Sequence, residues 1–379
     1  PPRPAAHLYS PRTLVTATAN NVRGRRFRFN WVDGFLWFIR IAAVIAIVVG
    51  VTGSIQNFMA GEGPTLAAWR DLIISSISTG FLYGLIALGY SMVYGILGFI
   101  NFAHGEVFMS GTMIGFVSAT IMFENGFWSA YPWAALSIVL LTAMATSISI
   151  AVLAERIAYR RLRGAPRLIP LITSIGVSFF LQYAFAGLFG VAPASFPEAP
   201  GNLGRTVNIL GLPLRGVQVV VIAVAIATMI SLWYYVTRTK TGRAIRAVAE
   251  DKEIAGLMGI NVDRTIVTTF AVGGAMAGVA ALMWALLYRS VAFYIGFLPG
   301  IKAFTAAVLG GIGNLPGALL GGVTLGLFEG VGPLLVLGGL GIPAVSQLRD
   351  AVAFAALILV LVFRPTGLLG ERLGSENRA

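Results

Sequence analysis

Long apolar segments, separated by shorter polar ones, occupy most of this 379-residue chain. A helix needs about 20 consecutive apolar residues to cross a bilayer, and most of these segments approach or exceed that length. The pattern predicts an all-α, polytopic membrane protein with nine to ten transmembrane helices, and segment 293–312 decides between the two counts. The apolar segments lie at about 34–60, 66–97, 106–123, 133–154, 168–190, 217–236, 265–288, 293–312, 316–338 and 347–363.

The first apolar segment, 34–60, follows a polar stretch, 1–33, that carries six arginines. A basic stretch before an apolar one is also typical of a secretory signal peptide. The segment is longer than the apolar region of a signal peptide, and its end, Asn57-Phe58-Met59-Ala60, is not a small-x-small cleavage site. We therefore expect 1–33 to be a basic cytosolic tail and 34–60 to be a retained transmembrane helix.

The composition agrees with a membrane protein and gives its orientation. Only 11% of the residues are charged, against about 25% in ordinary soluble domains, which excludes a soluble globular or a disordered chain. The net charge is +12, and 20 of the 27 Lys and Arg residues lie in the four segments 1–33, 155–167, 237–264 and 364–379. Ten crossings place all four segments on one side, which the positive-inside rule assigns to the cytosol, together with both termini. The basic excess is thus explained without a nucleic-acid partner.

The longest polar stretch between two apolar segments is 241–261, on the predicted cytosolic side. Two apolar segments need only a short connection, yet this one spends more than twenty residues on helix-forming sequence. Ala255 and Gly256 are small enough to let a helix sit in a groove on a partner. Gly259 suits the end of a helix, with Asn261 beyond it. We expect a docking element rather than a solvated loop.

Polar residues interrupt the apolar sequence at 95–106, where Asn101, His104 and Glu106 follow one another within six positions. Polar groups at this depth are costly unless they are buried in protein or face water. Gly98 and Gly105 allow the chain to bend there. These three residues either satisfy neighbouring helix ends or line a translocation path, and the structural role is the favoured interpretation.

Glu329 is a single acid within the glycine-rich apolar run 325–330. A carboxylate inside a membrane span is a functional-site hypothesis, and Lys302 and Arg289 are its candidate partners. Other glycines recur every four residues, a spacing that lets helices approach closely in lipid, so we expect them to serve helix packing. They are Gly313, Gly317, Gly321, Gly322, Gly326 and Gly330.

No enzyme signature is present in the sequence. It contains no GxxxxGK[ST] loop and no HExxH, so we predict neither catalytic residues nor a cofactor bound by this chain. The absence of cysteine excludes disulfides and thiolate metal sites, and two histidines leave little for a metal centre. We therefore expect no metal site.

Five motifs together resemble the permease of bacterial branched-chain amino acid ABC importers, of the LivH type. The likeness covers roughly residues 70–370. The first three are GLIALGYSMVYG at 84–95, INFAHGE at 100–106 and AEDKEIAGLMGINVDR at 249–264; AFTAAVLGGIG at 303–313 and RPTGLLG at 364–370 complete the set. The resemblance implies a type II importer-like permease with a transmembrane domain at 66–363, a cytosolic coupling loop at 237–264 and a cytosolic C-terminal tail at 364–379. Helix 34–60 is then an addition to the usual family length.

The resemblance also implies partners and a location. A second related permease, two ABC ATPase subunits that hold ATP and Mg, and a periplasmic substrate-binding protein would assemble with this chain in the bacterial inner membrane. Coupling to the ATPases would fall to Gly242, Arg243, Arg246, Glu250, Asp251, Ala255 and Gly259. The expected function is ATP-driven import of Leu, Ile and Val by alternating access. A urea or short-chain amide permease, and a stand-alone secondary transporter or channel, remain the alternatives.

Overall fold

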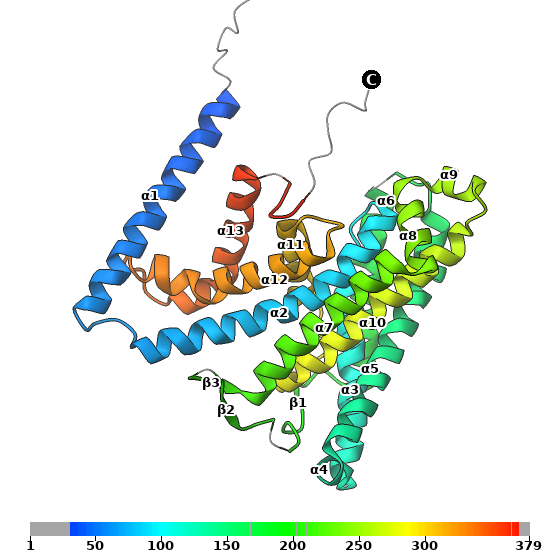
Figure 1. Ribbon diagram of the computed structural model, residues 1–379, viewed down its shortest axis with the longest axis horizontal. Helices are drawn as coiled ribbons and strands as arrows, with labels where there is room; N and C mark the ends of the chain where they lie inside the picture. Colours follow the sequence, from blue (N-terminus) through cyan, green and yellow to red (C-terminus); the bar gives the residue numbers. More distant parts are fainter. Residues whose placement is uncertain (1–30, 167, 202, 210, 365, 371–379) are drawn as a thin grey trace, which may run out of the picture.

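The computed structural model describes residues 31–166, 168–201, 203–209, 211–364 and 366–370. Most of the expected basic tail 1–33 and the end of the C-terminal tail, 371–379, lie outside the described residues. The described chain is predominantly helical, as the apolar pattern predicts (Figure 1).

Nine of the helices in the described residues are long and apolar enough to cross a membrane. The nine are α1 (Trp31–Met59), α2 (Leu66–Leu97), α3 (His104–Glu124), α5 (Pro132–Ala154), α6 (Leu168–Phe189), α7 (Gly216–Arg238), α10 (Val262–Tyr288), α12 (Leu315–Gly330) and α13 (Arg349–Phe363). Short helical turns lengthen three of them: η1 (Glu155–Tyr159) and η2 (Arg160–Leu162) extend α5, η3 (Pro333–Leu337) extends α12, and η4 (Val345–Leu348) precedes α13.

The predicted segment 293–312 forms a shorter helix, α11 (Phe297–Gly310), of 14 residues. Its last turn lies beside the C-terminal stretch, because the Leu368 N–H donates to the Leu309 carbonyl at 2.8 Å. The remaining helices are shorter connections: α4 (Phe127–Ala130), α8 (Lys240–Glu250) and α9 (Lys252–Leu257). Ten apolar segments therefore form ten helices, one of them too short to span a bilayer unaided.

The described parts of the predicted basic segments lie toward one end of the molecule (Figure 1). Arg160 binds Asp263 at 2.9 Å, which joins the segment after α5 to the start of α10. The Asn314 side chain donates to the Leu369 carbonyl at 3.0 Å. Arg40 of α1 donates to the Val362 carbonyl at 2.7 Å, so the first and last membrane-crossing helices meet there as well. We call this end the basic end; α8 and α9 lie there (Figure 1).

The opposite end carries the Pro- and Gly-rich loop, which contains short strands that the sequence pattern did not predict. Strand β1 (Ala194–Ser195) pairs with β4 (Ser290–Val291), and β2 (Thr206–Ile209) forms an antiparallel hairpin with β3 (Leu212–Arg215). The Trp128 indole N–H donates to the Glu198 carbonyl at 2.8 Å and ties this loop to α4. The loops between the long helices thus form a structured cap.

Helices α2, α11 and α12 pack through glycine. A Cβ at Gly322 would lie 2.4 Å from the Gly84 backbone nitrogen, and one at Gly326 would lie 2.5 Å from the Gly80 Cα. Gly317 and Gly321 approach α11 in the same way, and Gly330 faces Ser76. Four of the six predicted packing glycines therefore allow backbones to touch, and Gly330 packs against the side chain of Ser76.

The packing prediction is wrong for Gly313. It lies outside the helices, in the turn between α11 and α12, with φ +89 and open space where a Cβ would be. Asn314 caps α12 by accepting from the Gly317 N–H at 2.9 Å, so the helix begins after Gly313. This glycine serves the left-handed turn instead.

Candidate functional site

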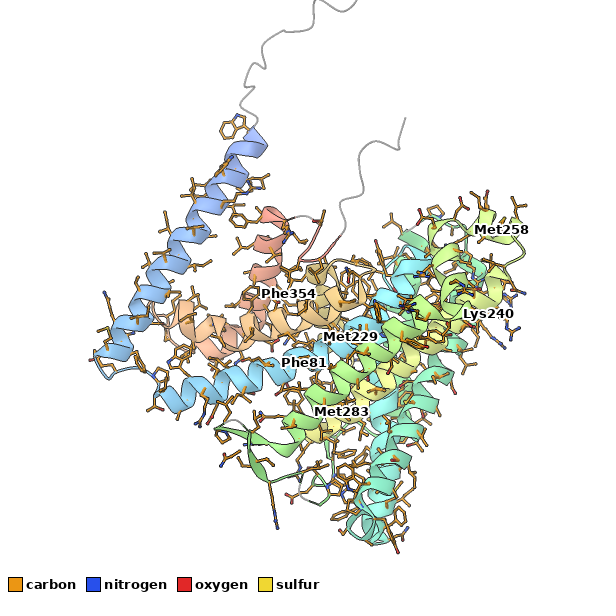
Figure 2. All side chains as sticks on the ribbon, viewed as in Figure 1. Phe81, Met229, Lys240, Met258, Met283 and Phe354 are labelled. Carbon is orange, nitrogen blue, oxygen red and sulfur yellow. The ribbon has the colours of Figure 1, made fainter. Side chains whose placement is uncertain are left out.

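The predicted coupling segment forms two helices that project from the basic end, with Lys240 and Met258 among their labelled side chains (Figure 2). Thr239 caps α8, accepting from the Gly242 N–H at 3.0 Å. A Cβ at Gly242 would lie 2.3 Å from the Tyr235 carbonyl oxygen, so this buried position turns the chain tightly away from α7. Asp251 caps α9, because its carboxylate accepts from the Glu253 and Ile254 N–H groups at 2.8 and 3.0 Å.

A tight C-cap ends α9. Gly259 has φ +82, its N–H donates to the Gly256 carbonyl, and the Ile260 N–H donates to the Ala255 carbonyl. This pair of bonds is the Schellman arrangement, which favours glycine at the left-handed position. The predicted C-cap role of Gly259 is confirmed.

Of the coupling residues predicted from sequence, Gly242 and Ala255 are buried, and the others are exposed: Arg243, Arg246, Glu250, Asp251 and Gly259. The structure adds an apolar surface that the predicted set lacks. Ile254, Leu257 and Met258 are 59, 87 and 78% exposed at the tip of α9. Helix α9 has six residues and only Ala255 among them is buried, so the helix cannot bury these three side chains. The shortness of the helix was the signal in the sequence that could have indicated an exposed apolar surface.

Charged residues link the coupling segment to the rest of the basic end. Arg163 pairs with both Asp263 at the start of α10 and the fully buried Glu155 of η1. Burial lowers the pKa of Lys252 in α9, and the nearby positive charge of Arg163 lowers it further. The junction of α9 and α10 is thus held against η1.

The break between α2 and α3 is buried in protein. Gly98 ends α2 with φ +72, as expected for a bend. The Tyr159 hydroxyl of η1 donates to the Asn101 side-chain oxygen at 2.7 Å, and both residues are buried. His104 packs edge-on against Tyr90, with ring centroids 4.7 Å apart.

Glu106 is fully buried in the first turn of α3 and accepts from the Ser178 hydroxyl at 3.4 Å. Gly105 beside it packs directly on Gly296 and Gly300 at the start of α11. Asn101, His104 and Glu106 are therefore buried in protein, although His104 Nε2 and one Glu106 carboxylate oxygen have no hydrogen-bond partner among the described residues. Both a structural role and a role in translocation stay predictions.

Glu329 binds one of its two candidate partners. Lys302 of α11 lies 2.9 Å from the Glu329 carboxylate and also binds Asp350 of α13 at 2.7 Å, a partner that the sequence did not indicate. The other candidate, Arg289, pairs with Glu198 in the capping loops at 2.9 Å.

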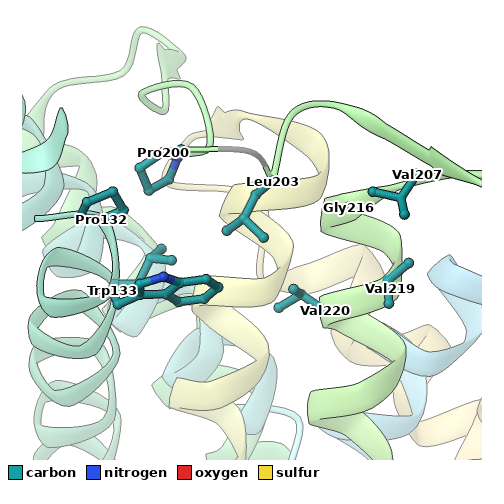
Figure 3. A pocket seen from close by; sticks show the side chains of 10 residues that line it. Pro132, Trp133, Pro200, Leu203, Val207, Gly216, Val219 and Val220 are labelled. Atoms are coloured by element: carbon teal, nitrogen blue, oxygen red, sulfur yellow. The ribbon is translucent and has the colours of Figure 1, made fainter.

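A pocket of about 430 Å³ lies at the opposite end, between the starts of α5 and α7 (Figure 3). Its lining is mainly apolar and includes Trp133, Leu203 and Val220. None of the predicted site residues reaches it, so the structure adds a concave surface to the end that faces away from α8 and α9.

A family model described as "Branched-chain amino acid transport system / permease component" matches residues 72–361. The chain belongs to this family. The permease is 43% identical over 315 residues to BraD of Pseudomonas aeruginosa, which covers 81% of this chain and 98% of BraD. It is 40% identical over 302 residues to LivH of Escherichia coli K12, covering 79% of this chain and 94% of LivH.

Both relatives carry the name of high-affinity branched-chain amino acid transport system permease proteins. Among solved structures, "PsaBC from Streptococcus pneumoniae in complex with Fab" matches at 14% identity with a TM-score of 0.41, over 81% of this permease and 95% of that chain. The family match begins within α2, so α1 lies outside it.

Proposed function

We propose that this permease is the transmembrane subunit of an ATP-driven importer for Leu, Ile and Val in a bacterial inner membrane. It works by alternating access with a second related permease, two ABC ATPase subunits and a periplasmic binding protein. The basic end, with both termini, faces the cytosol. Family membership supports the substrate class, and the exposed tip of α9 supports the coupling.

The tip of α9 is the observation that carries the coupling role. Ile254, Leu257 and Met258 expose apolar side chains next to charged ones at the basic end, where water rather than lipid surrounds them. An exposed apolar patch of this kind marks a protein contact. The motif at 249–264 resembles the family's docking loop, which supports the ATPases as the partner at this contact.

The link from α9 to α10 supports a mechanical role. Asn261 caps α10, accepting from the Arg264 N–H at 2.9 Å, and only Met258 to Asn261 separate the two helices. Asp263 in the first turn of α10 is fastened to Arg160 and Arg163. When ATP draws the ATPases together, a displacement of α9 therefore moves the start of α10, which packs against α2 and α5.

The opposite end fits delivery of substrate. Its capping loops and the apolar pocket of Figure 3 face away from α8 and α9, where a periplasmic binding protein would dock. The permease itself then needs no high-affinity substrate site, because the binding protein provides the affinity.

The test is uptake of leucine by the complete complex in proteoliposomes. Leu257→Asp places a charge in the α9 tip and should abolish uptake while the ATPases lose permease-dependent hydrolysis. Val191→Asp, at a 69% exposed apolar position of the opposite end, is the matched control for the coupling step and should retain ATPase docking. Normal uptake by Leu257→Asp would contradict the coupling assignment.

The same preparation separates the alternatives. Uptake of urea but not leucine would replace the substrate class. Uptake driven by an ion gradient in vesicles that contain only this chain would instead make it a stand-alone transporter.

A further inference from the structure

Three helices, α11, α12 and α13, bring charged side chains together on one face. Lys302 of α11 binds Glu329 of α12 at 2.9 Å and Asp350 of α13 at 2.7 Å. The Lys302 side chain is only 9% exposed, whereas that of Asp350 is 48% exposed. The cluster is therefore anchored inside the protein and opens outward at Asp350.

Two further helices extend this surface with hydroxyl groups. The Tyr83 hydroxyl of α2 donates to Glu329 at 3.3 Å and receives a bond from Lys302 at 3.4 Å. One turn earlier on the same face of α2, the Thr79 hydroxyl lies 2.8 Å from that of Tyr288, at the end of α10. We call the surface formed by Thr79, Tyr83, Tyr288, Lys302, Glu329 and Asp350 the polar face.

Other surfaces of the spanning helices are apolar. Helix α6 exposes Ile172 and Phe180 at 66 and 70%, and α5 exposes Leu141 and Leu153 at 64 and 50%. These surfaces suit contact with lipid. A carboxylate exposed by half does not, since charged groups inside a membrane face the interior of an assembly or a water-filled cavity.

We propose that the polar face lines the water-filled translocation pathway and that the charged ends of the substrate pass along it; the identity of the substrate rests on the proposed function. A free amino acid at neutral pH carries a carboxylate and an ammonium group. Lys302 offers a cation to the carboxylate, and Asp350 offers an anion to the ammonium. Because Asp350 is half exposed, a substrate carboxylate can take its place on Lys302 while the ion pair between Lys302 and Glu329 stays in place.

The permease contains no cysteine, so single cysteines report accessibility without a background from this subunit. We would introduce Thr79→Cys on the polar face and, as a matched control, Ser149→Cys at an exposed position of α5 between Leu141 and Leu153. The complete complex in proteoliposomes is treated with a positively charged methanethiosulfonate, which reacts with a thiolate in water. Asp350→Cys provides a second probe of the face.

Thr79→Cys should react at least about tenfold faster than Ser149→Cys, and leucine supplied with the binding protein and ATP should slow it. Equal rates at the two positions would overturn the proposal. A second result would also overturn the proposal: Thr79→Cys resists the reagent but forms a disulfide with a cysteine placed in the partner permease. The polar face would then be a contact between the two permeases from which water is excluded.

The same experiment distinguishes a failure of the proposed function from a failure of the proposed pathway. If the wild-type complex takes up leucine and Thr79→Cys is inert, only the position of the pathway is wrong. If Thr79→Cys reacts rapidly but leucine is neither transported nor protective, the substrate assignment is wrong and the aqueous face stands.

Discussion

Replacing a glycine by alanine should destabilise the permease at Gly322 but not at Gly176. At Gly322 the added Cβ would lie 2.4 and 2.5 Å from the nitrogen and Cα of Gly84. Carbon atoms in contact lie about 3.5–4.0 Å apart, so α12 would have to move from α2 by about 1 Å. At Gly176 in α6, nothing lies within 4 Å of the added atom.

The magnitudes follow from these environments. Overpacking of a close contact costs about 1–3 kcal/mol, and the better helix propensity of alanine offsets up to about 1 kcal/mol. Gly322→Ala should therefore be destabilised by about 1.5 kcal/mol at the midpoint of these ranges and by at most about 3 kcal/mol. Gly176→Ala has no packing cost and should be unchanged or more stable by up to about 1 kcal/mol.

Tryptophan fluorescence of the purified permease, heated at one fixed rate in one detergent, measures the comparison. Gly322→Ala should unfold below the wild-type temperature and Gly176→Ala at or above it. A Gly322→Ala variant that unfolds at the wild-type temperature would refute the view that α2 and α12 are held by direct backbone contact.

Three further outcomes are expected. Lys302→Met should destabilise the permease by about 3–5 kcal/mol because it leaves the Glu329 charge uncompensated, and Lys302→Met combined with Glu329→Gln should recover much of the loss in thermal unfolding; a double variant as unstable as the single one would contradict this. Tyr159→Phe should cost about 1–3 kcal/mol by leaving the buried Asn101 oxygen without its donor, and an unchanged unfolding temperature would show that this bond is dispensable. Gly259→Ala strains the left-handed cap by about 1–2 kcal/mol and should lower leucine uptake per ATP hydrolysed; an unchanged ratio would contradict a coupling role for this cap.

The sequence indicated the helices because the length of an apolar segment is a local property. It also led to Lys302 as a partner of Glu329, since a charge inside a span needs an opposite one. Asp350 was missed because its approach depends on how the start of α13 packs on α11. The bond between Tyr159 and Asn101 joins residues 58 positions apart and follows from tertiary packing alone.

Gly313 shows how a local signal can be outweighed. Its four-residue spacing from Gly317 matches a helix face, yet Asn314 and Pro316 are typical of a helix start and place Gly313 before it. Arg289 pairs with Glu198 and not with Glu329 for another reason. The loop that carries Glu198 is positioned by the long-range pairing of β1 with β4, which the sequence does not show.

The π-helix η1 determines the direction in which the side chains that follow α5 point. A π-turn holds one more residue than an α-turn, and each residue of a regular helix turns the chain by about 100°. If these five residues adopted α geometry, Tyr159 would swing through about a quarter of a circle, away from Asn101. A one-residue deletion upstream in α5 would therefore remove the hydrogen bond between Tyr159 and Asn101. The break between α2 and α3 would lose this contact although no residue in the break has changed.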